Sequence, residues 1–172
     1  MTSRVTIRAY DADTDESAVW QLKREFELAL GAGTGGDDKA AAYAEKLTPR
    51  YRDRWLAWVD RCVAEEPGCV VVGEPDGAGT AATDLVGYAF LLPESLSFVW
   101  DAAVLNEIYV DPDRRGTGVA DALLDAVVAR ARAQDLPLDR LVLDVDAEND
   151  RANAFYRRHG FEPWGEMVAR EL

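Results

Sequence analysis

The chain has 172 residues, of which 48% are apolar and 30% are charged. This length is sufficient for the core of one ordinary domain, so we expect a single domain over residues 1–172, with the composition of a globular protein. The net charge of −13 repels nucleic acid and anionic membranes, and we expect neither as a partner. No stretch approaches about 18 consecutive apolar residues, which excludes a membrane span, and the N-terminus lacks the pattern of a signal peptide. These features predict a soluble, cytoplasmic protein.

Two explanations for the acidic excess are open. It could line a pocket for a cationic substrate, or it could form a solvated surface suited to high salt. Only three of the nineteen basic residues are lysines, and acidic residues occur along the whole chain, which favours the second explanation. Cys62 and Cys69 are expected as buried thiols, and the single histidine, His159, is expected as a plain helix-end residue, so no metal site is predicted.

The first half of the chain alternates between strand-like and helical patterns. Residues 15–30 place apolar side chains on one helical face, at Val19, Leu22, Phe26 and Leu30. Pro49 is expected to divide a second helical region. The predicted elements are a strand at 5–9, a helix at 15–30, a flexible loop at 31–38, helices within 39–65, and strands at 69–72 and 85–92.

The second half continues with the same two patterns. We expect a long strand at 99–110, a helix at 117–133, a strand at 141–145, a short helix at 149–159 and a final strand at 166–171. This order predicts an α/β (α+β) layer fold.

Two glycine-rich stretches are candidates for a nucleotide site. Gly31-x-Gly33-x-x-Gly36 matches a dinucleotide pattern, but it follows a helix and lacks a βαβ unit, so we expect a surface loop. The stretch from Arg115 to Ala120 instead lies between a strand and a helix. Its glycines permit close approach of the backbone, and the helix N-terminus attracts an anion. Taken alone, this loop is equally compatible with a helix start that binds nothing.

Two motifs together resemble the GNAT superfamily of acetyl-coenzyme A-dependent N-acetyltransferases. The first is Tyr109-Val110 followed by Arg115-x-x-Gly118-x-Ala120. The second begins about thirty residues later, as Asn149-x-x-Ala152-x-x-Phe155-Tyr156-x-x-x-Gly160-Phe161. The resemblance covers residues 105–161 well and implies a mixed sheet of about six or seven strands flanked by about four helices.

The resemblance also implies how acetyl-CoA, the co-substrate, would be held. Backbone amides of 116–121 would bind the pyrophosphate, and the pantetheine arm would lie beside the strand at 108–110, where a main-chain N–H polarises the thioester. The implied binding residues are Ile108, Tyr109, Val110, Arg115, Gly116, Thr117, Gly118, Val119, Ala120, Asp121, Asn149, Ala152, Phe155 and Tyr156.

Two residues are candidates for proton transfer. The resemblance implies Tyr156 as the general acid for the leaving thiolate, although the pattern alone favours a core tyrosine on the helix face. Glu107 is the candidate base for the acceptor amine, with Asp101 as a weaker alternative. Trp20, Trp55 and Trp58 are candidate walls of the acceptor pocket.

The expected function is therefore transfer of an acetyl group to a primary amine, either a small molecule or a protein N-terminus. A coenzyme A-binding module without catalysis and a purely structural domain are the alternatives. A homodimer is left open, and the sequence does not identify the acceptor.

Overall fold

The computed structural model describes residues 4–33, 35–77 and 84–172. The N-terminal part begins with a strand and three helices, followed by two strands: β1 (Val5–Ala9), α1 (Ala12–Gly33), α2 (Gly36–Glu45), α3 (Pro49–Glu65), β2 (Val70–Pro75) and β3 (Gly87–Leu91). The remaining elements are the 3-10 helix η1 (Glu94–Val99), β4 (Ala103–Val110), the 3-10 turn η2 (Pro112–Arg114), α4 (Val119–Ala131), β5 (Leu141–Val142) and α5 (Asp150–Arg158).

The strands form one sheet in the order β1-β2-β3-β4-β5. The pairs from β1 to β4 are antiparallel, while β4 and β5 are parallel. The last pairing is short, since only Ala103 and Val104 of β4 align with Leu141 and Val142 of β5. The sheet is therefore mixed, and β5 pairs with β4 only at the N-terminal end of β4.

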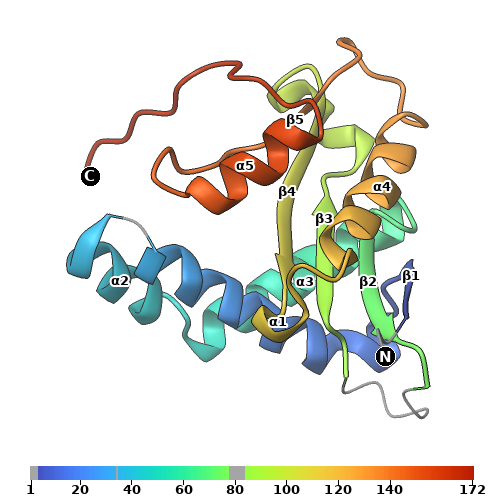
Figure 1. Cartoon of the computed structure of the whole chain (residues 1–172), viewed down its shortest axis with the longest axis horizontal. Coiled ribbons are helices and arrows are strands. Elements are labelled where there is room, and N and C mark those ends of the chain that lie inside the picture. Colours follow the sequence, from blue (N-terminus) through green and yellow to red (C-terminus); the bar gives the residue numbers. More distant parts are fainter. Residues whose placement is uncertain (1–3, 34, 78–83) are drawn as a thin grey trace.

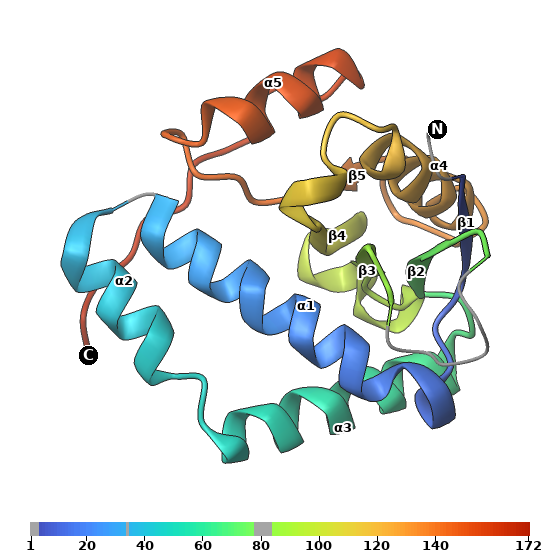
Figure 2. The same cartoon turned by 60° about the horizontal axis from the view of Figure 1, so that its bottom comes forward.

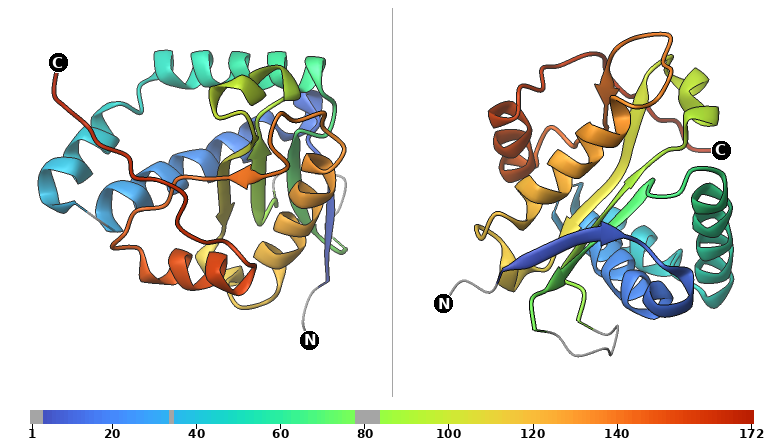
Figure 3. Two further views of the ribbon diagram at one scale, coloured as in Figure 1. Left: turned by 90° about the horizontal axis from the view of Figure 1, so that it is seen from above. Right: turned by 90° about the vertical axis from the view of Figure 1, so that its right-hand side faces the viewer.

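Helices cover both faces of this sheet. Figure 1 shows α4 in front of the strands and α1 and α3 behind and below them, and the right-hand view of Figure 3 shows the strands between these two groups. One apolar core lies between the sheet and α1 and α3, and includes Val19, Trp55, Val59 and Phe90. The other lies between the sheet and α4, and includes Leu123, Leu124, Val127 and Leu91.

Local sequence signals account for the positions of several helix ends. Thr48 accepts a hydrogen bond from the Tyr51 amide and Pro49 opens α3, a regular N-terminal arrangement because proline lacks the N–H that a first turn leaves unpaired. Asn149 caps α5 through the Ala152 amide at 3.1 Å. Figure 2 shows that α2 projects away from the sheet beyond the end of α1.

The structure corrects four predictions from the pattern. The run at 99–110 is not one strand, because η1 reaches Val99 and the strand begins only at Ala103. Gly31 and Gly33 lie in the last turns of α1 rather than in a loop. Residues 166–171 form no strand, and the described residues contain five strands rather than six or seven. The C-terminal segment extends along the outside of the molecule, where Met167, Val168 and Leu172 are exposed and no neighbouring strand supplies a ladder.

The strand expected at 141–145 is also shorter, because only Leu141 and Val142 pair with β4, and the other expected elements agree with the structure to within a few residues at their ends. The helical region around Pro49 is divided into α2 and α3, and the helices at 117–133 and 149–159 correspond to α4 and α5. Cys62 and Cys69 are both buried and free. Residues 78–83, between the expected strands at 69–72 and 85–92, lie outside the described residues.

Candidate active site

The strands β4 and β5 separate after their short pairing, and this separation exposes a stretch of backbone. β4 continues for six residues beyond Val104, whereas β5 ends at Val142. Along Leu105–Val110, β4 pairs with β3 on one side, and within the described part of the chain no strand pairs with its other side. The free N–H and C=O groups on that edge can bond an extended ligand placed between the two strands. The predicted binding residues Ile108, Tyr109 and Val110 lie on this stretch.

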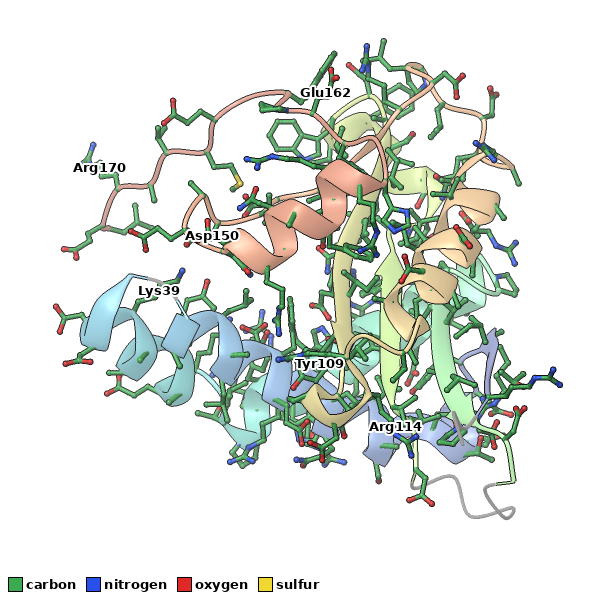
Figure 4. All side chains as sticks on the ribbon, in the orientation of Figure 1. Lys39, Tyr109, Arg114, Asp150, Glu162 and Arg170 are labelled. Atoms are coloured by element: carbon green, nitrogen blue, oxygen red, sulfur yellow. The ribbon has the colours of Figure 1, made fainter. Side chains whose placement is uncertain are left out.

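The C-terminal end of β4 leads directly into the glycine loop. Figure 4 shows Tyr109 and Arg114 near this end of the strand. Gly116 and Gly118 have φ values of 74° and 87°, a left-handed conformation that favours glycine. A Cβ atom built on either residue would meet no protein atom within 4 Å, so the space above the loop is open.

The open space lies at the N-terminus of α4, whose 13 residues follow Gly118. The first amides of a helix have no intrahelical acceptor and carry partial positive charge, which makes the site suitable for a diphosphate. The loop is held by its own contacts: Arg115 Nε donates to the Val110 carbonyl at 3.3 Å, and Thr117 Oγ1 donates to the Arg114 carbonyl at 2.5 Å. The residues present therefore fit a pyrophosphate group.

An acidic residue in the first turn of α4 is neutralised by α5. The Asp121 carboxylate lies 2.7 Å from Arg158 and 2.9 Å from His159. Although burial opposes the change, these two contacts lower the pKa of Asp121. The end of α5 is thus fastened beside the glycine loop, and the negative charge of Asp121 is balanced near the anion site. His159 is the residue that ends α5, as expected.

The second motif forms the inner face of α5. Asn149 caps the helix, and Phe155 and Tyr156 pack against the core below α4, together with Ile108 of β4. The Tyr156 ring contacts Phe155 and Phe161 in edge-to-face geometry, with centroids 5.3 and 5.5 Å apart. Burial raises the pKa of Tyr156 to about 12, so the hydroxyl keeps its proton at neutral pH.

Glu107 lies on the opposite face of the sheet because of a β-bulge. The β3–β4 register pairs Phe90 with Glu107 and Leu91 with Leu105, which leaves Asn106 as the extra residue. An extra residue reverses the alternation of side chains beyond it. Val104 and Tyr109 both belong to the core under α1 and α3, which five residues of regular strand would not allow. The bulge thus turns Glu107 inward toward α1.

The Glu107 carboxylate is buried, with 6% of its surface exposed, and both of its oxygens have partners. Oε2 accepts a hydrogen bond from the Tyr88 hydroxyl at 2.7 Å. Oε1 accepts one from Lys23 Nζ at 2.5 Å and longer contacts, at 3.4 Å, from Trp55 Nε1 and Asn106 Nδ2. Of these partners, Asn106 is exposed and connects the carboxylate to the open edge of β4.

A second carboxylate lies behind this group. Lys23 also donates to Glu27, and the other oxygen of Glu27 lies 2.5 Å from Lys46 Nζ. Burial opposes the charge on Lys23, but the carboxylates of Glu107 and Glu27 outweigh it and raise the lysine pKa. Burial likewise opposes the charge on Glu27, whose pKa is nevertheless lowered by Lys23 and Lys46. Lys23 and Glu27 are therefore both charged at neutral pH.

The structure separates some of the predicted residues. Glu107 points toward α1 and Tyr156 packs on the α4 side, so the two approach the open edge of β4 from opposite faces of the sheet. Asp101 is exposed and precedes β4, six residues from Glu107 along the chain. The three tryptophans pack in the core under α1 and α3 rather than around an open pocket, although Trp55 reaches Glu107.

Lys23, Glu27 and Tyr88 were not anticipated from the sequence. A usable signal exists for two of them, since Lys23 and Glu27 lie on the same helical face as Val19 and Phe26, which is otherwise apolar. Charged residues at core positions of a helix require partners, and their spacing of four residues places them together.

Within residues 4–33, 35–77 and 84–172, no group of three or more His, Cys, Asp or Glu side chains is placed to hold a metal ion. None of the helices described in this chain combines the length and apolar character needed to cross a membrane.

Comparisons with known proteins place this geometry in a family. A mycothiol acetyltransferase of Salinispora tropica is 32% identical, over 98% of this chain and 48% of that protein. An L-methionine sulfoximine/L-methionine sulfone acetyltransferase of Pseudomonas aeruginosa is 34% identical, over 52% of this chain and 51% of that protein. The chain spans about half the length of the curated relatives it matches.

The fold is also similar to that of a solved structure, the PaiA N-acetyltransferase of Thermoplasma acidophilum in complex with coenzyme A. The TM-score is 0.68 at 17% sequence identity, over 92% of this chain and 90% of that one. The model of the acetyltransferase (GNAT) family matches residues 35–161, which include the glycine loop and both motifs. The chain therefore belongs to the GNAT acetyltransferase family.

Proposed function

We propose that this protein transfers an acetyl group from acetyl-CoA to a primary amine. The observation that carries the proposal is the open edge of β4, which leads from the Asn106 bulge to the amides at the start of α4. An extended thioester donor with a diphosphate at one end matches this arrangement. The amides of 116–121 would hold the diphosphate, and the backbone of 108–110 would hold the arm and polarise the carbonyl.

Glu107 is proposed to receive the proton that the acceptor loses. An alkyl ammonium has a pKa of about 10.4 and is almost wholly protonated at pH 7, so the amine must lose a proton before it attacks. Because both Glu107 oxygens have partners, the proton reaches the carboxylate through a water or along the exposed Asn106 side. Consecutive strand residues point to opposite faces, so with the bulge setting its face, Glu107 can face the acceptor while its neighbour Ile108 lines the donor side.

Tyr156 is proposed to return a proton to the leaving thiolate. A thiol with a pKa of about 8.5 is more acidic than this tyrosine, whose pKa is raised to about 12 by burial. The hydroxyl is therefore protonated when the C–S bond breaks and can donate to the sulfur as charge develops there. Because the thiol is the stronger acid, complete transfer is uphill, and Tyr156 then regains a proton from water. Tyr156 lies on α5 and packs, like Ile108 of β4, against the apolar core on the α4 face of the sheet, which is the proposed donor side.

The class of acceptor is proposed from the relatives of this chain. The names of the two relatives point to small-molecule acceptors, and we extend that class to this chain. A protein N-terminus is the second candidate, because the same chemistry serves any primary amine.

The test is thiol release from acetyl-CoA by the full chain, measured with a panel of amines that includes L-methionine sulfone, aminosugar derivatives and peptides with free N-termini. Amine-dependent release is the expected result. Thermal shift with coenzyme A is measured in parallel. Stabilisation without turnover on any amine would support a binding module instead, and no stabilisation at saturating coenzyme A would contradict both functions.

A further inference from the structure

Four charged side chains form a continuous row from Glu107 to the protein surface. Lys23 contacts Glu107 and Glu27, and Glu27 contacts Lys46 through its second oxygen. The first three side chains are at most 6% exposed, whereas that of Lys46 is 35% exposed. The row starts on β4, passes through two residues of α1, and ends just beyond α2.

The row is an expensive way to fill a core. Burying two carboxylates and an ammonium removes them from water, and apolar side chains of similar volume are often as stabilising or more so. The neighbouring positions Val19 and Leu22 of α1 are apolar and buried, as is usual for the inner face of a helix. A structural role alone therefore gives no reason for choosing charges at Lys23 and Glu27.

Of the groups that contact Glu107, one offers a route for a proton that does not pass through the proposed substrate side. Trp55 and Asn106 offer N–H groups that do not titrate. The Tyr88 hydroxyl is fully buried and donates to Glu107 itself, so among the described residues it leads to no second carboxylate. The open edge of β4 is the place of the proposed substrates. Lys23 remains, and it alone of these partners also contacts a second carboxylate.

We propose that Lys23 and Glu27 relay the acceptor's proton from Glu107 to solvent at Lys46. This inference rests on the proposed function and identifies the positioning residues of the same site. The balance is simple. An N–H bond of the acceptor breaks and an O–H bond forms on Glu107; Lys23 then gives a proton to Glu27 and regains one from Glu107. Glu27 releases its proton to water beside Lys46, so one proton leaves and all three residues return to their starting state.

The groups around Glu27 are suited to the last step. Lys23 and Lys46 approach its two oxygens, and the Tyr51 hydroxyl donates to it at 3.3 Å. The two cations keep Glu27 ionised at rest, so a proton that reaches it from Lys23 is held weakly and is released to water. Because Lys46 is partly exposed, water can reach the end of the row without entering the acceptor site.

The relay is tested with Glu27→Gln, which retains the shape of the side chain but does not accept a proton. We expect kcat for amine-dependent thiol release to fall about tenfold or more, in the lower part of the range for lost proton transfer, with the KM for acetyl-CoA unchanged. The solvent deuterium isotope effect on kcat should increase, because proton exit becomes limiting. Glu27→Asp, which retains a carboxylate, should recover most of the rate.

Glu16→Gln is the matched control, since Glu16 lies on the same helix but pairs with Arg52 at the surface. It should leave kcat and the isotope effect as in the wild type. If Glu27→Gln does not fold, the double variant Lys23→Gln/Glu27→Gln replaces the relay with neutral groups and the same outcomes apply.

Wild-type kcat in Glu27→Gln would overturn the relay, and so would a lower kcat with an unchanged isotope effect and no recovery in Glu27→Asp. If the wild-type protein releases no thiol with any amine, the result contradicts the proposed function and therefore also the relay. An active wild type with an indifferent Glu27→Gln variant contradicts the relay alone.

Discussion

The Tyr88 hydroxyl donates a hydrogen bond to Glu107 Oε2 over 2.7 Å, and both groups are buried between the sheet and α1. The contact joins neighbouring strands, but it depends on the bulge at Asn106, which turns Glu107 to the face that Tyr88 occupies. Because burial and the adjacent carboxylate keep Tyr88 protonated, the hydroxyl holds Glu107 in one orientation. The candidate base is thus fixed by the tertiary structure on its inner side and connected through Asn106 to the open edge.

Glu107→Gln should separate catalysis from donor binding. The amide retains the size of the side chain but does not take a proton, so we expect kcat to fall about 10²-fold or more. The affinity for acetyl-CoA should remain, because the proposed donor site lies on the other face of the sheet. Thiol release and calorimetric titration with acetyl-CoA measure the two effects. Equal turnover in wild type and variant would show that Glu107 is not the base.

Lys23→Met should destabilise the fold strongly at neutral pH. The variant leaves Glu107 and Glu27 buried without the cation between them, and removing one partner of a buried pair costs about 3–5 kcal/mol of unfolding free energy. Urea unfolding at pH 7 measures the loss. Lys39→Met is the control, because its ion pair with Asp146 is partly exposed and should contribute about 1 kcal/mol or less. Similar losses in the two variants would contradict the buried network.

The same network predicts how stability depends on pH. The pKa of Glu27 is lowered on folding. Its contribution to the free energy of unfolding is therefore present at pH values above its ordinary pKa of 4.5, and it is lost as the pH falls through the pKa in the folded protein. The pKa of Lys23 is raised, so its contribution exists below its ordinary value of 10.5 and is lost as the pH rises through the folded value. We expect a stability plateau between about pH 5 and 10. In Lys23→Met, stability should instead increase toward pH 5, as a buried carboxylate takes up a proton. Urea unfolding across this pH range measures the effect. A stability of Lys23→Met that does not change with pH would contradict the buried network.

Tyr156→Phe should lower kcat by about 10²-fold or more while acetyl-CoA still binds, since only the hydroxyl proton is lost. The control is Tyr10→Phe. The Tyr10 hydroxyl is buried, and among the described residues it has no hydrogen-bond partner, so its removal should leave turnover unchanged and should not reduce stability. Full turnover in Tyr156→Phe would remove that residue from the mechanism.

Gly118→Val should abolish binding of the donor. The new side chain would occupy the open space at the start of α4, and the φ of 87° would strain any residue with a Cβ. Gly77→Val separates these effects, because Gly77 has a φ of 83° and open space around it but lies at the end of β2, away from the loop. Both variants should lose stability to a similar degree, while only Gly118→Val loses coenzyme A binding in a thermal-shift titration. Retained affinity would refute the position of the diphosphate.

The sequence alone determined the features that depend on local order. The apolar face of α1, the division at Pro49, the start of α4 after Gly118 and the cap of α5 by Asn149 follow from spacing and turn chemistry. The two motifs at 105–161 also identified the family, since they place an anion site and a helix in a fixed order. These signals are readable because each element is specified by residues within a few positions of one another.

The tertiary structure decided what depends on contacts distant in sequence. The bulge at Asn106 reverses the face of Glu107, and only the β3–β4 register reveals it. Lys23 meets Glu107 across 84 positions of the chain, so no local pattern could pair them. Residues 166–171, expected as the last strand, form none here, because a strand requires a neighbour to complete its hydrogen bonds. Sequence fixes local conformation through short-range sterics and hydrogen bonding, whereas the environment of a buried charge is set by whichever distant segments the packing brings against it.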